Sequence, residues 1–568
     1  MLKYQETKMV KKIFGLVNKE IANIHNAAYF LAFFTLLSQI LGLFRDRMLT
    51  YFYGAGEMLD VYYASFRIPD FIFVMVGSFI SVSIVIPFLQ EKINEGKEST
   101  KEFIDNVFSL FFVLIIFVSV IAFIFMPTLT RFLFSQMDAG SIENIVHFSR
   151  ILLLSPLFMG ISNLFASITQ THRRFVLYAI CPIIYNAAIL FGIIFLRPIF
   201  GLGGVIAGVL LGAFLHGFIQ VPFVSKTGLL PDIVLPIKIK AIRKIFDVAL
   251  PRTIGLALGS IALIGLVAIA STLQAGSISI FNLAYNLQSV PLLMIGLSYS
   301  MAAFPLLSKL FSSGEKKKYT ETIIVATKHI IFLSLPVIAF FVVLRAQIVR
   351  VVLGSGNFSW DNTRLTAACL AIFAFAAAAQ CLCMLFVRAY YAAGSTKKPL
   401  IINTVSSVLL VVFPLFFLFL FKEVPSTLTF LEHIFKISQI EGTEIIALPL
   451  GFSIGSLINA FLFIYIFEKD FKGLWKGINK TLFQSFCAAV MIGFGSYIGL
   501  NIFDNLFDLT RLWGIFFQGL LAGIVGIGSG IVTLHILGSK ELFEVGRTLH
   551  RKFWKKPEVV VPDQSDMK

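Results

Sequence analysis

The chain has 568 residues, of which 57% are hydrophobic and only 14% are charged, and its formal net charge at pH 7 is +16. A soluble domain carries about 25% charged residues because its surface faces water, so this composition excludes an ordinary soluble protein. The apolar runs are continuous and lack the alternation of membrane β-strands, which predicts an all-α polytopic membrane protein.

About fourteen apolar runs are long enough to cross a bilayer as helices, which takes about 20 residues each. In chain order they cover residues 27–50, 60–90, 103–127, 145–169, 176–197, 202–224, 246–273, 280–308, 321–344, 365–390, 399–421, 444–467, 481–502 and 512–537. We expect two six-helix lobes around a central cavity, at 27–224 and 246–467. The last two spans, within 481–537, are expected to pack beside the lobes.

The remaining segments are an N-terminus at 1–26, a basic cytoplasmic linker at 225–245 and a cytoplasmic tail at 538–568. Apolar residues of the N-terminus share one helical face, which indicates an amphipathic helix on the membrane surface. The alternative is a disordered basic leader. We also expect a second amphipathic stretch around 542–554 and a short outer helix after Ser426.

The basic residues are concentrated in alternate connections. The richer connections contain Lys3–Lys19, Lys92–Lys101, Arg173–Arg174, Lys226–Lys244, Lys309–Lys318, Arg388–Lys398, Lys469–Lys480 and the segment from Lys540 onward. This asymmetry follows the positive-inside rule and places both termini in the cytoplasm. It therefore explains the positive charge without a nucleic-acid partner.

Two segments of the sequence read alike. The first contains Ala55-Gly56, Val61-Tyr-Tyr-Ala64, Pro69 and Ile86-Pro-Phe-Leu89, and the second contains Ala275-Gly276, Phe281-Asn-Leu-Ala284, Pro291 and Phe304-Pro-Leu-Leu307. They pair spans one and two with spans seven and eight, and repeats of this kind surround a site near the bilayer midplane. The alternative is chance similarity between two apolar hairpins.

Ionisable groups inside spans are candidate functional residues, because each costs about 2.5–3.5 kcal/mol on insertion scales. The ionisable residues in the first two spans are Arg45, Asp46, Arg47, Asp60, Arg67 and Asp70, and the polar Ser38 and Gln39 lie nearby in the sequence. Pro69 breaks the second span beside Arg67, which favours a cavity there. Arg47, by contrast, is expected to extend to the outer interface.

Two further candidates lie in spans seven and eight. Arg252 lies about 10 Å into its span at 1.5 Å per residue, where it either binds substrate or pairs with Asp247. Asn286 either lines the same cavity or forms a hydrogen bond between helices.

The sequence contains no P-loop, no His-Glu-x-x-His motif and no Gly-x-Ser-x-Gly elbow. The five cysteines all lie in apolar runs, where Cys acts as a small hydrophobic residue. We therefore expect no enzyme activity, no catalytic residue, no metal site and no cofactor. Asp60 or Asp70 could carry a coupling proton, but no pattern identifies a coupling ion.

The opening of the chain also contains motifs of a known family. They are Ser38-Gln-Ile-Leu-Gly-Leu-Phe-Arg45-Asp46, Phe52-Tyr-Gly-Ala-Gly56, Asp60-Val-Tyr-Tyr-Ala-Ser-Phe-Arg-Ile-Pro69 and Ile86-Pro87. This stretch resembles the MurJ/MviN family of lipid II flippases, within the multidrug/oligosaccharidyl-lipid/polysaccharide exporter superfamily. The resemblance is most specific over 38–90 and extends to nearly the whole chain in architecture.

The resemblance implies that the protein moves undecaprenyl-diphosphate-linked disaccharide pentapeptide to the outer leaflet of the bacterial inner membrane, for peptidoglycan synthesis and cell shape. It also implies alternating access, with a cationic cavity holding the diphosphate. Arginine suits this role because its planar fork pairs with phosphate oxygens. By the same resemblance Ser38, Arg45, Asp60 and Arg67 belong to the site, and membrane lipids and the cell-wall synthesis machinery are the expected partners.

This sequence departs from the family pattern at several cavity positions. Gln39, Phe73 and Asn286 stand where the family usually has arginine, and Asp70 stands where it has asparagine. The family's Gly-Glu-Gly-Ala stretch is replaced by residues 77–80. Two alternatives therefore stay open, namely an exporter of another polyprenyl-linked glycan or small amphiphile, and a non-transporting scaffold for envelope assembly.

Overall fold

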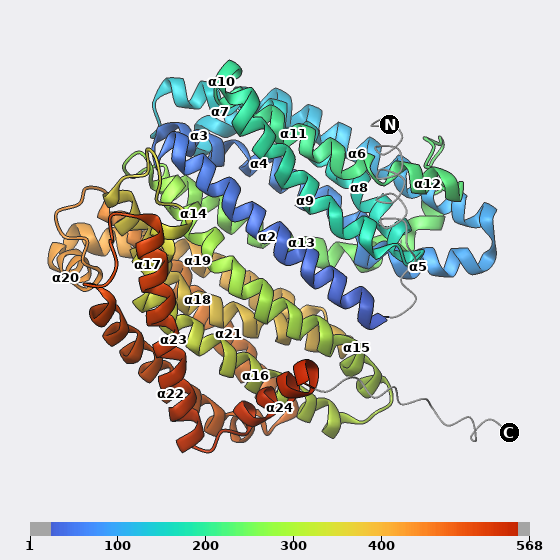
Figure 1. Ribbon diagram of the computed structural model, residues 1–568. Coiled ribbons are helices and arrows are strands. Elements are labelled where there is room, and N and C mark those ends of the chain that lie inside the picture. Colours follow the sequence, from blue (N-terminus) through green and yellow to red (C-terminus); the bar gives the residue numbers. More distant parts are fainter. Residues whose placement is uncertain (1–23, 555–568) are drawn as a thin grey trace, which may run out of the picture. The chain divides into compact units, whose positions relative to one another are not determined.

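A computed structural model describes residues 24–554, and the side chains of all of these except 24–32, 83, 239–248, 251 and 548–554. The described residues form helices and no strand, which confirms the predicted all-α class (Figure 1). The predicted amphipathic helix at 1–26 lies almost entirely outside the described residues.

The helices follow one another with short connections. They are α2 (Ile24–Tyr53), α3 (Glu57–Ser65), α4 (Arg67–Ile72), η1 (Phe73–Gly77), η2 (Ser78–Ile80), α5 (Val82–Glu95), α6 (Lys97–Leu133), α7 (Ala139–Leu152), α8 (Leu154–Thr171), α9 (Phe175–Phe191), η3 (Gly192–Leu196), α10 (Arg197–Phe200), α11 (Leu202–Phe218), α12 (Val221–Thr227), α13 (Ile239–Ala270), α14 (Ser277–Pro291), η4 (Leu292–Leu297), α15 (Ser298–Ser312), α16 (Lys316–Val343), α17 (Arg345–Val352), α18 (Trp360–Ala392), α19 (Lys397–Glu423), α20 (Pro425–Phe435), η5 (Thr443–Ile446), α21 (Ala447–Phe471), α22 (Leu474–Phe503), α23 (Leu512–Ile536) and α24 (Lys540–Trp554).

The predicted spans agree with this helix order. Within the described part of the chain, 13 helical segments are long and apolar enough to cross a membrane, and they coincide with predicted spans two to fourteen. Helix α2 occupies the position of the first predicted span. The outer helix predicted after Ser426 is α20, and the amphipathic stretch predicted in the tail is α24.

The chain divides into two compact units. Unit one comprises Met1–Val290, Val349–Ala376 and Ser395–Asn459, as far as these are described, and unit two comprises Pro291–Ile348, Ala377–Gly394 and Ala460–Lys568. The division into lobes at 27–224 and 246–467 stays a prediction, since compactness alone does not define the bodies that move during transport.

The second and eighth spans share an interruption. In span two, Pro69 in α4 is followed by the π-helical segment η1, and in span eight Pro291 is followed directly by the π-helical segment η4. Proline removes a backbone donor and crowds the preceding turn, so the hydrogen-bonding register shifts locally. The two interruptions occur at corresponding points of the two similar segments, which supports the predicted internal repeat.

In unit one, α9 and α11 pack through glycine (Figure 1). Gly204, Gly208 and Gly212 are one turn apart on α11. A Cβ atom added at Gly208 would lie 2.7 Å from Gly192 Cα and 2.9 Å from the Ala188 carbonyl oxygen. Small residues at this spacing let two backbones approach closely in a membrane, where dispersion contacts replace the hydrophobic effect.

We expect Gly208→Ala to destabilise the protein by about 1–3 kcal/mol, the usual cost of overpacking, because the new methyl group meets backbone that cannot move aside. Gly203→Ala on the same helix is the matched control, since the nearest atom to its Cβ is a Phe148 ring carbon at 3.8 Å. Thermal unfolding in detergent micelles measures both variants. Equal midpoints for the two would contradict the close packing.

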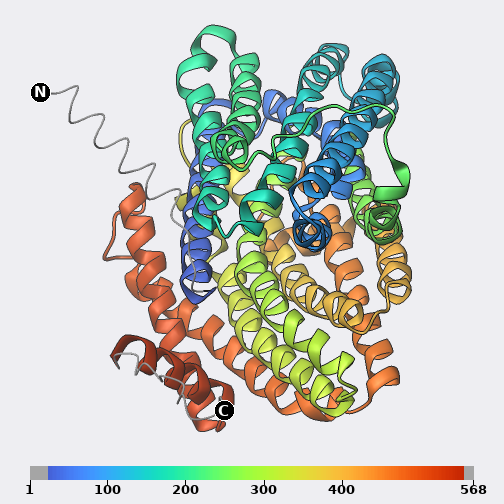
Figure 2. The same cartoon turned by 90° about the vertical axis from the view of Figure 1, so that its right-hand side faces the viewer.

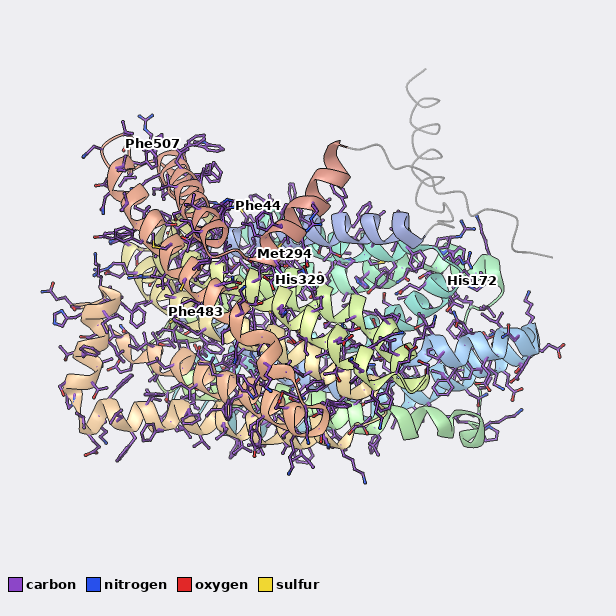
Figure 3. The ribbon with its side chains drawn as sticks, turned by 90° about the horizontal axis from the view of Figure 1, so that it is seen from below. Phe44, His172, Met294, His329, Phe483 and Phe507 are labelled. Carbon is purple, nitrogen blue, oxygen red and sulfur yellow. The ribbon has the colours of Figure 1, made fainter. Side chains whose placement is uncertain are left out.

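Unit two contains a second closely packed pair, α22 and α23. A Cβ atom at Gly499 would lie 2.8 Å from Ala522 Cα, so these two helices also meet through small residues. Their outer faces are apolar, and Phe483 is 62% exposed, as expected where a helix faces lipid (Figure 3).

Helix α24 turns across the end of α23 (Figure 2) and is fastened to α22 by a hydrogen bond of 2.7 Å from Thr481 Oγ1 to the Glu541 carboxylate. Burial alone would raise the pKa of the Glu541 carboxyl, but the hydrogen bonds from Thr481, its own backbone N–H and Ser539 outweigh burial and leave this pKa lowered.

Candidate substrate site

A polar network in unit one joins α2, α9 and α14 around Arg45. The Arg45 guanidinium donates two hydrogen bonds to Asp46 Oδ1, of 3.0 Å from Nε and 2.8 Å from Nη2. Its Nη1 donates to Asn186 Oδ1 at 3.3 Å. Asp46 is 3% exposed and also accepts a bond of 3.1 Å from Asn286 Nδ2. Arg45 is therefore held in one orientation by Asp46 and Asn186, and Asn286 holds Asp46 from a third span.

Ser38 belongs to the same network. Asn186 Nδ2 lies 3.3 Å from Ser38 Oγ and 3.4 Å from the Ser38 carbonyl oxygen. Gln39 is the next residue on α2 and is half-buried. The sequence did not lead us to predict Asn186. A signal was present, however, since Asn186 is a polar residue within the apolar run 176–197.

Arg67 forms a second polar contact. Its Nη2 donates to Asn282 Oδ1 on α14, while its Nε is buried with no hydrogen-bond partner. Asp70 is exposed and lies near enough to Arg67, Tyr62 and Tyr185 to act on their charges. A buried guanidinium N–H without an acceptor costs about 1–3 kcal/mol, and an anionic ligand oxygen would remove that cost.

Asp60 is buried, and its carboxylate binds the start of α14. Oδ2 accepts from the Gly276 backbone N–H at 2.6 Å, and Oδ1 accepts from the Ser279 N–H at 2.7 Å and from the Ser279 hydroxyl. Asp60 therefore caps the N-terminus of α14 from another helix. Asp60 was expected to belong to the substrate site, but both of its carboxylate oxygens accept hydrogen bonds from the backbone of α14 and its N-terminal turn.

Arg47 was expected to extend to the outer interface, but it binds protein. Its guanidinium donates to the carbonyl oxygens of Val351 and Val352, and the neighbouring Thr50 hydroxyl donates to the Leu353 carbonyl at 2.9 Å. The backbone N–H of Asn357 donates to the Tyr51 carbonyl at 2.9 Å. These bonds fasten the end of α2 to residues 351–357.

Arg252 lies away from the Arg45 network. Helix α13 packs against α4, η1, η2, α5 and α6, and the Thr253 and Ser78 hydroxyl oxygens are 2.5 Å apart. The relation between the two similar segments would place span seven opposite span one, but α13 packs on spans two and three and on α19. Arg252 is half-buried there, and the Asp247 side chain of the alternative pairing lies outside the described residues.

The described residues of this site bring together Ser38, Arg45, Asp46, Asn186 and Asn286, with Arg67, Asn282 and Asp70 nearby on the same unit. Each arginine has an amide oxygen as one partner and an aspartate close by. Such a site is polar, rigid and close to charge balance. It can bind an anion when a ligand oxygen replaces an aspartate at a guanidinium. No group of His, Cys, Asp and Glu among the described residues is arranged to hold a metal ion.

An apolar helical bundle with a buried polar site between proline-interrupted spans defines a multi-pass membrane transporter. In fold, the chain is similar to an inward-facing multidrug resistance MATE transporter of the MOP superfamily, with a TM-score of 0.63 and 14% identity over 77% of this chain and 96% of that one. It is also similar to a lipid II flippase MurJ in an inward closed conformation, with a TM-score of 0.69 and 20% identity over 91% and 99% of the two chains.

The family model for lipid II flippase MurJ matches residues 49–517, and the chain belongs to this family. A probable lipid II flippase MurJ of Bdellovibrio bacteriovorus is 24% identical over 92% of this chain and 96% of its own. The lipid II flippase MurJ of Burkholderia cenocepacia is 22% identical over 66% and 75%. The predicted family is thus confirmed.

Proposed function

We propose that the protein moves lipid II from the cytoplasmic to the outer leaflet of the bacterial inner membrane by alternating access, as a transporter without a catalytic step. Family membership supports this function, and so does the fold. The observation that carries it is the pair of arginines held inside an apolar bundle at Arg45 and Arg67. A scaffold would not need ionisable groups at this depth, since each is costly to insert.

The geometry around Arg45 supports the binding of a diphosphate. Asp46 occupies the face of the guanidinium that a phosphate would use, with Nε and Nη2 both directed at one carboxylate oxygen. An incoming diphosphate displaces this contact and accepts the same two bonds, while Asn186 keeps Nη1 in place. Asp46 then keeps its bond from Asn286, so its carboxylate is not left without a donor.

Arg67 gives the ligand a second cation. Its Nε has no acceptor, so a phosphate oxygen would satisfy a donor that is otherwise buried at a cost. Asp70 supplies a mobile counter-charge beside it, and we propose Asp70 as the acid that takes up a proton when the diphosphate binds. Asp60 does not fit this role because it accepts three hydrogen bonds at the start of α14.

Alternating access requires contacts that can break. We infer that the bonds from Arg47, Thr50 and Asn357 close the outer end of α2, and that they separate when the site opens outward. The positive-inside asymmetry supports this assignment of sides, with both termini in the cytoplasm. The cell-wall synthesis machinery is the expected partner on the outer side, where the product is used.

The test is transport by the purified full chain in proteoliposomes that contain fluorescent lipid II, with accessibility to an added enzyme or quencher measured over time. We expect lipid II to move, and a zwitterionic phospholipid of equal tail length to remain in its leaflet. Failure to move lipid II under conditions where a known family member succeeds would refute the proposal.

A second substrate is favoured by a specific observation. Gln39, Phe73 and Asn286 replace three arginines of the family pattern, so the site has fewer cations to select a particular diphosphate-linked headgroup. An arm of the same assay with another polyprenyl-diphosphate glycan separates the two substrates, because a higher rate for this glycan would reassign the function within the exporter class.

A further inference from the structure

A separate cavity of about 550 Å³ lies in unit one, between the α8–α9 connection and the end of α12. It is lined by Thr171, His172, Arg173, Arg174, Phe223, Lys226 and Thr227. Three of these residues are cationic and none is acidic. Figure 3 shows His172 at this end of the unit. The cavity is not part of the Arg45 network, and its volume lies within the about 300–1,000 Å³ typical of ligand sites.

Two of the lining side chains, Arg174 and His172, pack on the ring of Phe223. The Arg174 guanidinium lies over the Phe223 ring at 5.5 Å from its centroid, and the His172 ring meets the same phenylalanine edge-on at 5.8 Å. Phe223 thus fixes two groups that face the cavity. The planar guanidinium fork of arginine matches the geometry of phosphate oxygens.

Arg173 occupies an unusual backbone conformation for its residue type. It ends α8 with φ of 57°, in the left-handed region where glycine is preferred, and the Arg174 N–H closes the turn on the Thr169 carbonyl at 2.9 Å. A non-glycine residue in this region is strained, because its Cβ atom lies too close to the backbone. The position therefore has an arginine where helix termination alone would favour glycine.

The residues and helices around the cavity suit the headgroup of a membrane lipid. Phe214 and Phe218 on α11, the helix before α12, stack on one another and are 44% and 54% exposed, so α11 carries an apolar surface. The cavity lies at the ends of α8 and α12, in the two basic connections that the positive-inside rule assigns to the cytoplasmic leaflet. Basic pockets between spans on this side suit anionic lipid headgroups.

We propose that this cavity binds the phosphate ester of an anionic phospholipid of the inner leaflet, with Arg173, Arg174 and Lys226 as its cations. The site goes beyond the proposed transport function, since it lies on other helices and uses none of the same side chains. A soluble phosphate offers the same oxygens, so the experiment must separate the two sources.

The chain offers a variant that removes charge without harming the fold. Arg173→Gly deletes a cation at a backbone position where glycine is the favoured residue, so we expect unchanged or higher thermal stability. The exposed Lys226→Gln removes a second charge. The matched control is Lys316→Gln with Lys317→Gln, which neutralises two exposed lysines in another predicted cytoplasmic connection.

Binding is measured by native mass spectrometry of the full chain in a neutral detergent, with short-chain phosphatidylglycerol, phosphatidylcholine and inorganic phosphate as separate probes. We expect selective retention of phosphatidylglycerol, about tenfold weaker in Arg173→Gly and weaker again in the double variant, since one charge-assisted bond accounts for about tenfold or more. The lysine control should bind like the unaltered chain.

The outcomes are distinct. Inorganic phosphate that competes with phosphatidylglycerol supports the phosphate-ester chemistry, and retention of phosphatidylglycerol without such competition assigns the source to the lipid. Binding of inorganic phosphate without binding of phosphatidylglycerol would show that the cavity binds anions, but would overturn the proposal that its ligand is a phospholipid. Equal binding of phosphatidylglycerol and phosphatidylcholine, or equal loss in the lysine control, overturns the proposal whether or not the protein transports lipid II.

Discussion

Replacing Arg45 by lysine is expected to reduce transport of the lipid-linked diphosphate about 100-fold while the protein still folds, since two charge-assisted hydrogen bonds from a planar fork cannot be reproduced by one ammonium group. Lysine retains the charge beside Asp46, so the buried carboxylate keeps a cationic neighbour. Initial transport rates in proteoliposomes, normalised to the amount of folded protein, measure the effect.

Alanine at this position is a poorer test, because it leaves Asp46 buried without its cation, and breaking a buried pair costs about 3–5 kcal/mol. The sharper variant is Arg45→Gln with Asp46→Asn, which keeps hydrogen-bonding groups at both positions and removes both charges. We expect it to fold and to transport no diphosphate lipid. The control is Arg131→Ala, an exposed arginine in the last turn of α6. Normal transport by the uncharged pair would show that Arg45 does not act through its charge.

The spans could be predicted from the sequence because each helix is specified locally. A run of about 20 apolar residues reaches across the bilayer, and its backbone must satisfy itself within the segment. Helices α20 and α24 could likewise be predicted from the helical spacing of apolar residues within each segment. The same local signal placed Arg45 and Arg67 inside spans, where their cost marks them as candidates.

The partners of these residues could not be predicted, because periodicity shows the face of a helix but not the helix that covers it. Arg45 meets Asn186 from a span 141 positions away, and Arg67 meets Asn282 from one 215 positions away. The contact of α13 with η1 and α6 was missed for this reason. The internal repeat relates equivalent spans, yet it does not say which non-equivalent spans touch.

Asp60 shows the same limit, since its position in an apolar span suggested a transport role. In the structure its carboxylate accepts hydrogen bonds from two backbone N–H groups and one hydroxyl at the start of α14, all of them buried. Helix α14 carries Asn282 to Arg67 and Asn286 to Asp46. The cap therefore determines where the amide groups of the substrate site lie, although the Asp60 carboxylate itself binds Gly276 and Ser279.

We expect Asp60→Ala to cost about 2–5 kcal/mol of stability, because it leaves two buried backbone donors and the Ser279 hydroxyl without an acceptor. Asp60→Asn retains one amide oxygen and places an NH₂ group against the other donor, so an intermediate loss is expected. Ser279→Ala removes only the hydroxyl bond and should cost least, about 1 kcal/mol. The midpoint of thermal unfolding in detergent should therefore be highest for Ser279→Ala, lower for Asp60→Asn and lowest for Asp60→Ala.

A proton-carrying acid would behave differently, and Asp70 provides the comparison. Asp70→Asn should leave the unfolding midpoint near that of the unaltered chain, because this exposed side chain caps no helix, and should flatten the dependence of transport on pH. Asp60→Asn should lower the midpoint of thermal unfolding. It should also reduce the transport rate by the same factor at every pH, since a smaller fraction of the protein has α14 correctly positioned. A stable Asp60→Asn variant with altered pH dependence would contradict the capping role and return Asp60 to the transport mechanism.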